Sequence, residues 1–393
     1  MISLDDLRSS IDLYRGCVSF SLPLCSLMGG AGPQLDLALQ YDGNVTHEAT
    51  TWNMTAPTGV LGLGWSLPVE RISVRFDHNT APADQEIILT TSGGSTRLLQ
   101  TGQVSTDVLS YATEDYRFWK IQRFLSTERW EITREDGVKY VYGDTRSRRS
   151  TVEYGVCWGN WIGSTSNLDT QQLIAVAWDL SQVIDLWDNT VTFRYAQVMA
   201  PVGGATGLSY TQAIYIDEIV GAAGDRAVFH RDNKTTNEYQ DPHTTPPPPN
   251  AWQDRFETQF LDRIEVFSPT NELMYKVKFD FTDGQGNTVF LGTGQLTKRL
   301  LMGVKTQSPD ALNDLPAVKF TYVTSNTDPA YGSIATVTTP AGGVNTYTYT
   351  ANNDLDLCDR TKALAPPSGA TYTQPRIWFE KDYVVVTWLG DNQ

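Results

Sequence analysis

The residues that could carry out acid–base, nucleophilic or metal chemistry are scattered along this chain of 393 residues. Neither a zinc-binding H-E-x-x-H motif nor a G-x-S-x-G nucleophile elbow is present. The histidines stand alone in polar sequence, which is typical of solvated loop residues; they are His47, His78, His230 and His243. The sequence therefore predicts no catalytic residues, no bound metal and a protein that is not an enzyme.

Two features keep other chemistry open. The chain has 45 Asp and Glu residues, and whether two of them form a glycoside-hydrolysing pair depends on their separation in space. Trp158 and Trp161 would suit stacking on sugar rings if they are exposed. A carbohydrate-binding or adhesive extracellular β module and a β-type glycosidase or lyase therefore remain alternative interpretations, with a glycan as a possible partner.

One acidic cluster, formed by Asp354, Asp356 and Asp359, carries the oxygen ligands that calcium prefers. Cys358 occupies the place where an EF-type loop needs a further oxygen, and the glycine of such a loop is missing. We interpret the cluster as a surface loop.

Three glycines resemble part of a phosphate-binding loop. Gly59, Gly62 and Gly64 are followed by Trp65 and then by Pro68, which prevents a helix from opening where a nucleotide phosphate would need one. Glycines at near-alternate positions also leave one face of a strand bare, so that another backbone can approach closely. We interpret the segment as a packed β corner, and we expect no cofactor.

Charge and composition exclude further classes of function. The formal net charge is −15, which disfavours binding to nucleic acid or to anionic membranes. The one basic cluster, Arg146, Arg148 and Arg149, is interpreted as a solvated loop. The four cysteines (Cys17, Cys25, Cys157 and Cys358) are too few and too dispersed for a disulfide framework.

The amino terminus has neither the basic region nor the long apolar region of a signal peptide, and no stretch of the chain is apolar enough to span a membrane. The abundance of Thr, Gly, Val and Tyr is typical of strands and turns.

The elements that must position any site are predicted to be β-hairpins. Five strands end in two aromatic residues separated by one residue, which places both rings on the same face of a sheet. These pairs are Tyr140/Tyr142, Phe193/Tyr195, Phe279/Phe281, Phe320/Tyr322 and Tyr347/Tyr349. We expect all five in antiparallel strands of one continuous curved sheet, with Arg194, Asp280 and Thr348 on its opposite face.

Several motifs follow one another in an order that matches a known family. Residues 32–41 (GPQLDLALQY) and 62–67 (GLGWSL) resemble the opening of SpvB-type amino-terminal domains, which begin the B components of Tc toxin complexes and many Rhs/YD-repeat proteins. Residues 130–132 (WEI), the turn Asp136-Gly137 and the pair Tyr142-Gly143 resemble the next motifs of that family.

The resemblance continues to the end of the chain. Residues 178–195 resemble the family's hairpin with a W-x-L start and a D-x-x-G-N turn, although Asp188 stands where glycine is usual. Three segments resemble successive Rhs shell strands, namely residues 261–264, 299–301 and 338–343. A fourth segment, residues 382–386, resembles the strand that leads to the next module.

The resemblance implies an all-β fold, a large curved antiparallel sheet of successive hairpins forming an Rhs/YD-like shell segment. It divides the chain into an amino-terminal extension (1–16), an SpvB-like opening β region (17–143), an insertion loop (144–172), a hairpin strip (173–350) with an external loop (230–254), and a carboxy-terminal connecting segment (351–393).

In function, the resemblance implies a non-catalytic shell that encloses or helps to deliver a toxic cargo polypeptide. The partners would be the remaining Rhs/Tc shell chain or domain and the cargo. The protein would be secreted within a toxin complex, without a signal peptide, after a cytoplasmic stage. The ADP-ribosyltransferase domain of SpvB needs an E-x-E or Q-x-E pair, which this chain lacks, so Ser164-Thr165-Ser166 is interpreted as a loop.

Overall fold

A computed structural model of the chain describes residues 8–12, 17–27, 30, 32–50, 58–75, 86–143, 151–155, 173–201, 209–239, 256–292, 297–310, 314–349, 372–380 and 383–390. The chain forms two compact units, Met1–Tyr347 and Thr348–Gln393. In the second unit, β25 (Tyr372–Glu380) and β26 (Tyr383–Gly390) form an antiparallel hairpin. No helix in the described parts of the chain has the length and apolar character needed to cross a membrane.

The first unit begins with a small antiparallel sheet, which we call the amino-terminal sheet. Its strands run in the order β1 (Arg8–Asp12), β2 (Cys17–Leu27), β3 (Leu35–Asp42) and β4 (Trp65–Ser66), and α1 (Thr46–Thr50) follows β3. In β3, buried Leu37, Leu39 and Tyr41 alternate with less buried residues, so the period-two pattern of the sequence correctly locates a strand with one buried face.

Eight strands then close into a ring, because β13 pairs with both β11 and β5. The ring consists of β5 (Arg71–Arg75), β6 (Glu86–Thr91), β7 (Gly94–Gln103), β8 (Val108–Thr113), β9 (Lys120–Phe124), β10 (Arg129–Thr133), β11 (Lys139–Gly143) and β13 (Leu173–Ile184). The short strand β12 (Thr151–Gly155) also pairs with β13. Closure removes two sheet edges that would otherwise be free to pair with another chain.

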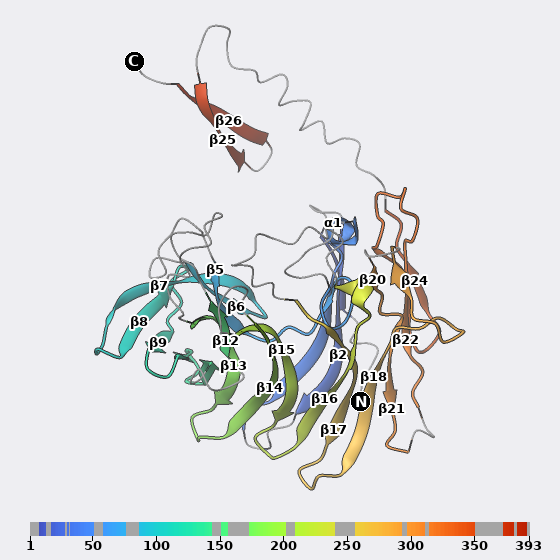
Figure 1. The fold of residues 1–393 in the computed structure, drawn as a ribbon, viewed down its shortest axis with the longest axis horizontal. Coiled ribbons are helices and arrows are strands. Elements are labelled where there is room, and N and C mark those ends of the chain that lie inside the picture. The colour runs from blue at the N-terminus through green and yellow to red at the C-terminus, as the bar shows by residue number, and fades with distance from the viewer. Residues whose placement is uncertain are drawn as a thin grey trace. The chain divides into compact units, whose positions relative to one another are not determined.

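A long strip of antiparallel hairpins continues the same sheet from β13 (Figure 1). It consists of β14 (Thr190–Pro201), β15 (Ser209–Val220), β16 (Arg226–Asn233), β17 (Gln259–Phe267), β18 (Leu273–Asp280), β21 (Gly303–Gln307), β22 (Val318–Tyr322), β23 (Ile334–Thr338) and β24 (Val344–Thr346). A 3-10 helix, η3 (Thr236–Glu238), follows β16, and a separate pair, β19 (Phe290–Leu291) with β20 (Lys298–Arg299), lies between β18 and β21. The predicted fold class, all-β with a large curved antiparallel sheet of hairpins, is confirmed.

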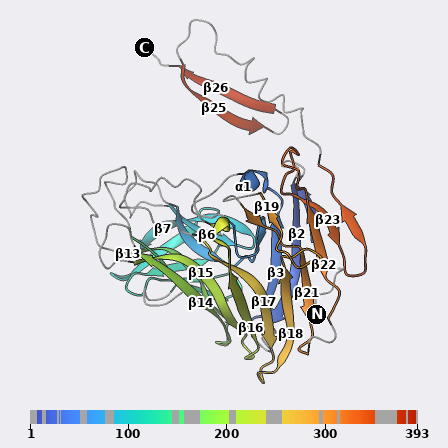
Figure 2. The ribbon, with the colours of Figure 1, turned by 45° about the vertical axis from the view of Figure 1, so that its right-hand side comes forward.

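The amino-terminal sheet packs against the strip, and Figure 2 shows β2 and β3 beside β21 and β22. The Trp65 indole donates a hydrogen bond to the Tyr322 hydroxyl at 2.9 Å, and its ring centroid lies 4.6 Å from that of Phe320. The Tyr41 hydroxyl accepts a hydrogen bond from the Ile334 amide at 3.2 Å. These contacts fill one face of the strip with the side chains of another sheet.

The opposite face of the strip carries charge. Glu218 forms ion pairs with Arg194 and, at 3.0 Å, with Arg226, and Asp262 pairs with Lys278 at 3.2 Å. Cross-strand pairs of opposite charge support a solvated sheet face. The strip therefore has an apolar side that is covered and a charged side that faces water.

Three of the five aromatic pairs point to the covered, apolar side of the strip. Both rings are buried in Phe193/Tyr195, Phe279/Phe281 and Phe320/Tyr322, while Arg194 and Asp280 between them are exposed. The strands that carry or end at these pairs, β14, β18 and β22, belong to one sheet, as predicted.

Two pairs differ from the expectation. In β11, Tyr140 and Tyr142 pair with Ile132 and Trp130 of β10 and share one face, but Tyr140, near the start of the strand, is only half-buried. Tyr347 and Tyr349 come after the end of β24 and are half-buried, although Thr348 is exposed as expected. In both pairs the alternation itself holds, and the difference lies in how fully the rings are covered and in the end of β24 before Tyr347.

Candidate functional site

The described residues contain no group of three or more His, Cys, Asp or Glu side chains that could hold a metal ion. His230 lies in β16, where its Nε2 is 3.0 Å from a carboxylate oxygen of Glu265 in the neighbouring strand. Glu265 also binds Arg263 at 3.1 Å and Lys276 at 3.6 Å, so His230 belongs to a surface network of charged side chains.

Many of the sequence-predicted candidates lie outside the residues whose side chains the structure describes. What the sequence predicts for these residues stays a prediction. The residues are His47, His78, Arg146, Arg148, Arg149, Cys157, Trp158, Trp161, Ser164, Thr165, Ser166, His243, Asp354, Asp356, Cys358 and Asp359.

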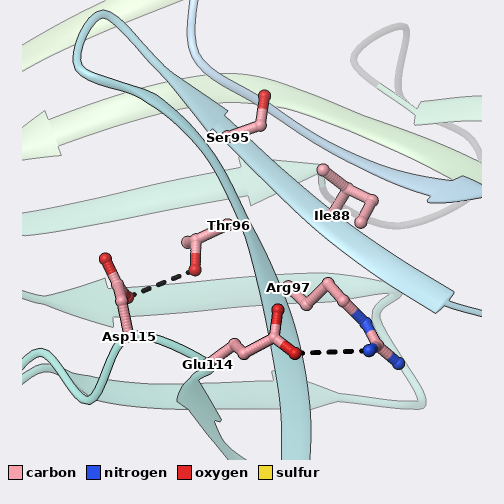
Figure 3. Close-up of a pocket in the computed structure, with 6 residues that line it drawn as sticks. All are labelled: Ile88, Ser95, Thr96, Arg97, Glu114 and Asp115. Atoms are coloured by element: carbon pink, nitrogen blue, oxygen red, sulfur yellow. Dashed lines mark hydrogen bonds and ion pairs between the residues drawn. The ribbon is translucent and has the colours of Figure 1, made fainter. Parts of the chain in front are cut away.

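A surface depression of about 400 Å³ lies on the ring (Figure 3). Its lining comes from β6, β7 and the turn after β8, and consists of Ile88, Ser95, Thr96, Arg97, Glu114 and Asp115. The Arg97 guanidinium lies 3.3 Å from Glu114 and 3.2 Å from Glu86, so both carboxylates are held by the same cation.

The charges of this depression do not suit acid catalysis. The Arg117 side chain donates a hydrogen bond to Asp115 at 2.7 Å, and this bond lowers the pKa of the Asp115 carboxyl. A general acid needs the opposite, a raised pKa that keeps its proton near neutral pH. The depression therefore offers a polar surface on which Asp115 is not tuned to act as the acid of glycoside hydrolysis.

A buried ionic cluster lies beside the glycine-rich corner. The Arg299 guanidinium donates two hydrogen bonds, each 2.9 Å long, to the two carboxylate oxygens of Glu238. Both residues are buried, and the guanidinium lies 3.9 Å from the centroid of the Phe260 ring. A bidentate fork of this kind satisfies a buried charge in the geometry that guanidinium and carboxylate share.

A lysine continues the ionic cluster. The Lys234 ammonium donates hydrogen bonds to the Thr58 carbonyl at 2.6 Å and to the Glu257 carbonyl at 3.0 Å. Burial lowers the pKa of Lys234 to about 8, and burial also raises the pKa of the Glu257 carboxyl. The cluster joins the segment after β16, the segment before β17 and the chain near Thr58, so it works as a structural junction.

The glycine-rich corner is confirmed as a site of close backbone approach. Gly62 has a φ of +86°, and a Cβ atom at this position would lie 2.4 Å from the Arg299 carbonyl oxygen. The Leu63 amide donates a hydrogen bond of 2.9 Å to that same carbonyl. The corner thus binds β20 through its backbone, and its Val60 carbonyl accepts a hydrogen bond of 2.8 Å from the Leu261 amide of β17, so these groups are not free to cradle a phosphate.

Sequence reasoning missed the ionic cluster. One signal was present, because Thr235 and Glu238 have the T-x-x-E spacing of a capping box, and the Glu238 side chain does accept the Thr235 amide at 2.8 Å. Nothing in the local sequence pairs Glu238 with Arg299, which is 61 residues away.

Comparison with known proteins finds similarity to a curated protein sequence and to several solved structures. No known family profile matches the sequence. The salivary gland surface protein 1 of Aedes aegypti is 26% identical over 205 residues, which cover 49% of this chain and 6% of that protein. The chain thus spans a small part of the length of the curated relative that it matches.

Solved structures share the fold over most of the chain. The crystal structure of TcdB2-TccC3 aligns over 80% of this chain and 16% of its own, with a TM-score of 0.52 and 13% identity. A structure of TcdB2-TccC3-Cdc42 aligns over 78% of this chain and 16% of its own, with a TM-score of 0.50 and 14% identity. The amino-terminal domain of SpvB from Salmonella typhimurium aligns over 83% of this chain and 100% of its own, with a TM-score of 0.37 and 13% identity.

The order of motifs in the sequence predicted a fold of the SpvB and Tc type, and the structure of TcdB2-TccC3 confirms this prediction at the level of the fold. The chain shares its fold with a region that makes up 16% of TcdB2-TccC3.

Proposed function

We propose that this chain is a structural segment of an Rhs/Tc-like toxin shell and that it acts without catalysis, by helping to enclose a toxic cargo polypeptide. The observation that carries the proposal is the fold shared with TcdB2-TccC3 over 80% of the chain. The motif order of the sequence supports the same assignment independently of the coordinates.

The packing of the first unit suits a closing part of such a shell. The amino-terminal sheet occupies the apolar face of the strip, with Trp65 against Phe320 and Tyr322. Because the amino-terminal sheet covers this face, the strip would not enclose a cargo by itself. The cavity for a cargo would be built by the remaining shell chain or domain. The charged outer face, with Arg194, Glu218 and Arg226, would face water.

Secretion as part of a toxin complex, the partner shell chain and the cargo belong to the same proposal. A carbohydrate-binding role rested on Trp158 and Trp161, which lie outside the described residues, and Asp115 in the polar depression has a lowered pKa, which does not suit the acid of a glycosidase. We therefore put forward the shell alone.

Protease protection tests enclosure. The chain would be produced together with the polypeptide encoded downstream of it, and a protease would be added to the intact assembly. We expect the cargo to survive until the shell is unfolded by denaturant. Digestion of the cargo at the rate of the free polypeptide would overturn the proposal.

A screen for glycoside, peptide and NAD-glycohydrolase turnover tests the absence of catalysis. We expect no turnover above that of a heat-unfolded control. Turnover that a single Asp or Glu substitution abolishes would instead assign the chain to an enzyme class.

A further inference from the structure

Four large apolar side chains are exposed at one end of the ring. Phe118 is 92% exposed and Tyr116 is 83% exposed in the turn between β8 and β9, while Trp187 and Leu186 are 75% and 66% exposed in the turn between β13 and β14. We call these four residues the tip patch. Large apolar groups gathered on a surface mark sites of interaction.

A third turn, between β10 and β11, joins the two halves of the tip patch. The Trp119 indole donates a hydrogen bond of 2.6 Å to the Glu135 carboxylate, which ties the β8–β9 turn to this third turn. On its other side, a Cβ atom at Gly137 would lie 2.5 Å from the Leu186 side chain. The patch therefore spans three neighbouring turns that contact one another.

The turns hold the tip patch in a defined conformation. The Asp185 carboxylate accepts hydrogen bonds from the Trp187 amide at 2.8 Å and from the Asn189 amide at 2.9 Å. In the other turn, the Thr113 hydroxyl accepts a hydrogen bond from the Arg117 amide at 2.8 Å. A turn whose backbone is already ordered loses less entropy when a partner binds.

Charge around the tip patch is negative. Exposed Glu135, Asp136 and Asp188 form none of the ion pairs found among the described residues. The two nearby arginines are compensated, since Arg134 lies 2.5 Å from Glu70 and Arg117 lies 2.7 Å from Asp115. Lys120 and Lys139, at the starts of β9 and β11, flank these turns, but the three carboxylates together with Asp185 outnumber them, so the tip keeps an excess of negative charge.

We propose that the tip patch is a docking surface for a basic polypeptide segment, one in which Lys or Arg residues alternate with apolar residues. Apolar side chains of the partner would bury Phe118 and Trp187, while its cations would face the three carboxylates and the aromatic rings. The proposal goes beyond enclosure and holds whether or not the chain belongs to a shell.

Fluorescence anisotropy with labelled peptides tests the proposal on the full chain. The probes are a short peptide of lysine and leucine, the same peptide with glutamate for lysine, and the same peptide with serine for leucine. The first variant is F118S/W187S, and its matched control is M274S, which removes a 53% exposed apolar side chain from β18. The second variant is E135Q/D136N/D188N, which removes charge and keeps the shape of the turns.

We expect the lysine–leucine peptide alone to bind, with affinity falling about tenfold or more in F118S/W187S and unchanged in M274S, since exposed aromatic anchors dominate such interfaces. The charge variant should also weaken binding and reduce its dependence on salt. Three results would each overturn the proposal. They are equal binding of the lysine–leucine peptide by F118S/W187S and the unchanged chain, equal binding of the glutamate peptide, and displacement of the peptide by a neutral oligosaccharide. Unaltered melting temperatures show that both variants fold, because the substituted residues are exposed.

Discussion

Lys234 shows what burial does to single residues in this protein. Its ammonium is held by the carbonyls of Thr58 and Glu257 rather than by a direct ion pair among the described residues. Cys25 is another group whose ionisation burial disfavours. At the residue scale, burial therefore shifts the pKa of single groups away from their ordinary values.

Replacement of Lys234 by methionine should change how stability depends on pH. The pKa of Lys234 falls from 10.5 to about 8 on folding. Between these values the unfolded chain holds a proton that the folded chain has released, so this residue makes the folded chain more stable as pH rises. We expect the unchanged chain to gain about 2–3 kcal/mol relative to K234M from about pH 7 to about pH 10.

Urea unfolding of both proteins across this pH range measures the effect. Cys25 and the tyrosines are present in both chains, so their contributions cancel in the difference. A difference between the two chains that does not vary with pH would contradict the lowered pKa.

Cys25 should resist alkylation in the folded protein. Burial raises the pKa of its thiol to about 12, and the thiolate is the reactive form. We expect iodoacetamide at neutral pH to leave Cys25 unmodified until denaturant is added, as measured by peptide mass mapping. Rapid modification of the native chain would show that the segment around β2 opens readily.

At the scale of elements, backbone contacts decide how the glycine-rich corner joins the strip. The Arg299 carbonyl accepts the Leu63 amide and leaves no room for a side chain at Gly62. The corner therefore depends on glycine for close approach as well as for its positive φ.

Two glycine substitutions separate these effects. Gly94 also has a positive φ, +115°, but nothing lies within 4 Å of the Cβ that alanine would add. We expect G94A to cost about 1–2 kcal/mol of unfolding free energy, from backbone strain alone, and G62A to cost at least about 2 kcal/mol more. Equal costs in urea unfolding would show that the corner can move away from β20.

At the scale of the whole molecule, β13 belongs to both the closed ring and the strip. It pairs with β5 and β11 in the ring and with β14 in the strip. A shared strand couples the two parts, because neither can lose it and remain folded.

Cavity-forming substitutions in the two parts should therefore shift one common transition. Ile132 in β10 and Ile264 in β17 are both fully buried. We expect I132A and I264A each to cost about 2–5 kcal/mol and to lower the melting temperature of a single calorimetric peak for the first unit. Two separate peaks, of which only one moves with each variant, would show that ring and strip unfold independently.

Particular residues show how far the sequence could predict this structure. Leu37, Leu39 and Tyr41 alternate in β3 as expected, and the pairs at Phe193, Phe279 and Phe320 locate buried strand faces in one sheet. The same rule placed Tyr140 on the face of Tyr142, but it could not show that Tyr140 is only half-buried or that β24 ends before Tyr347, because coverage and strand ends depend on the neighbouring elements.

The sequence by itself determined the β character, the hairpin order and the direction in which most aromatic rings point, since strand periodicity and turn residues act over a few positions. Only the tertiary structure decided that β13 closes a ring with β5, that Trp65 covers Phe320, and that Arg299 pairs with Glu238. Those contacts join residues 61 to more than 200 positions apart, as the 257-residue separation of Trp65 and Tyr322 shows. Local patterns cannot specify them, because which distant surfaces meet depends on how the whole chain packs.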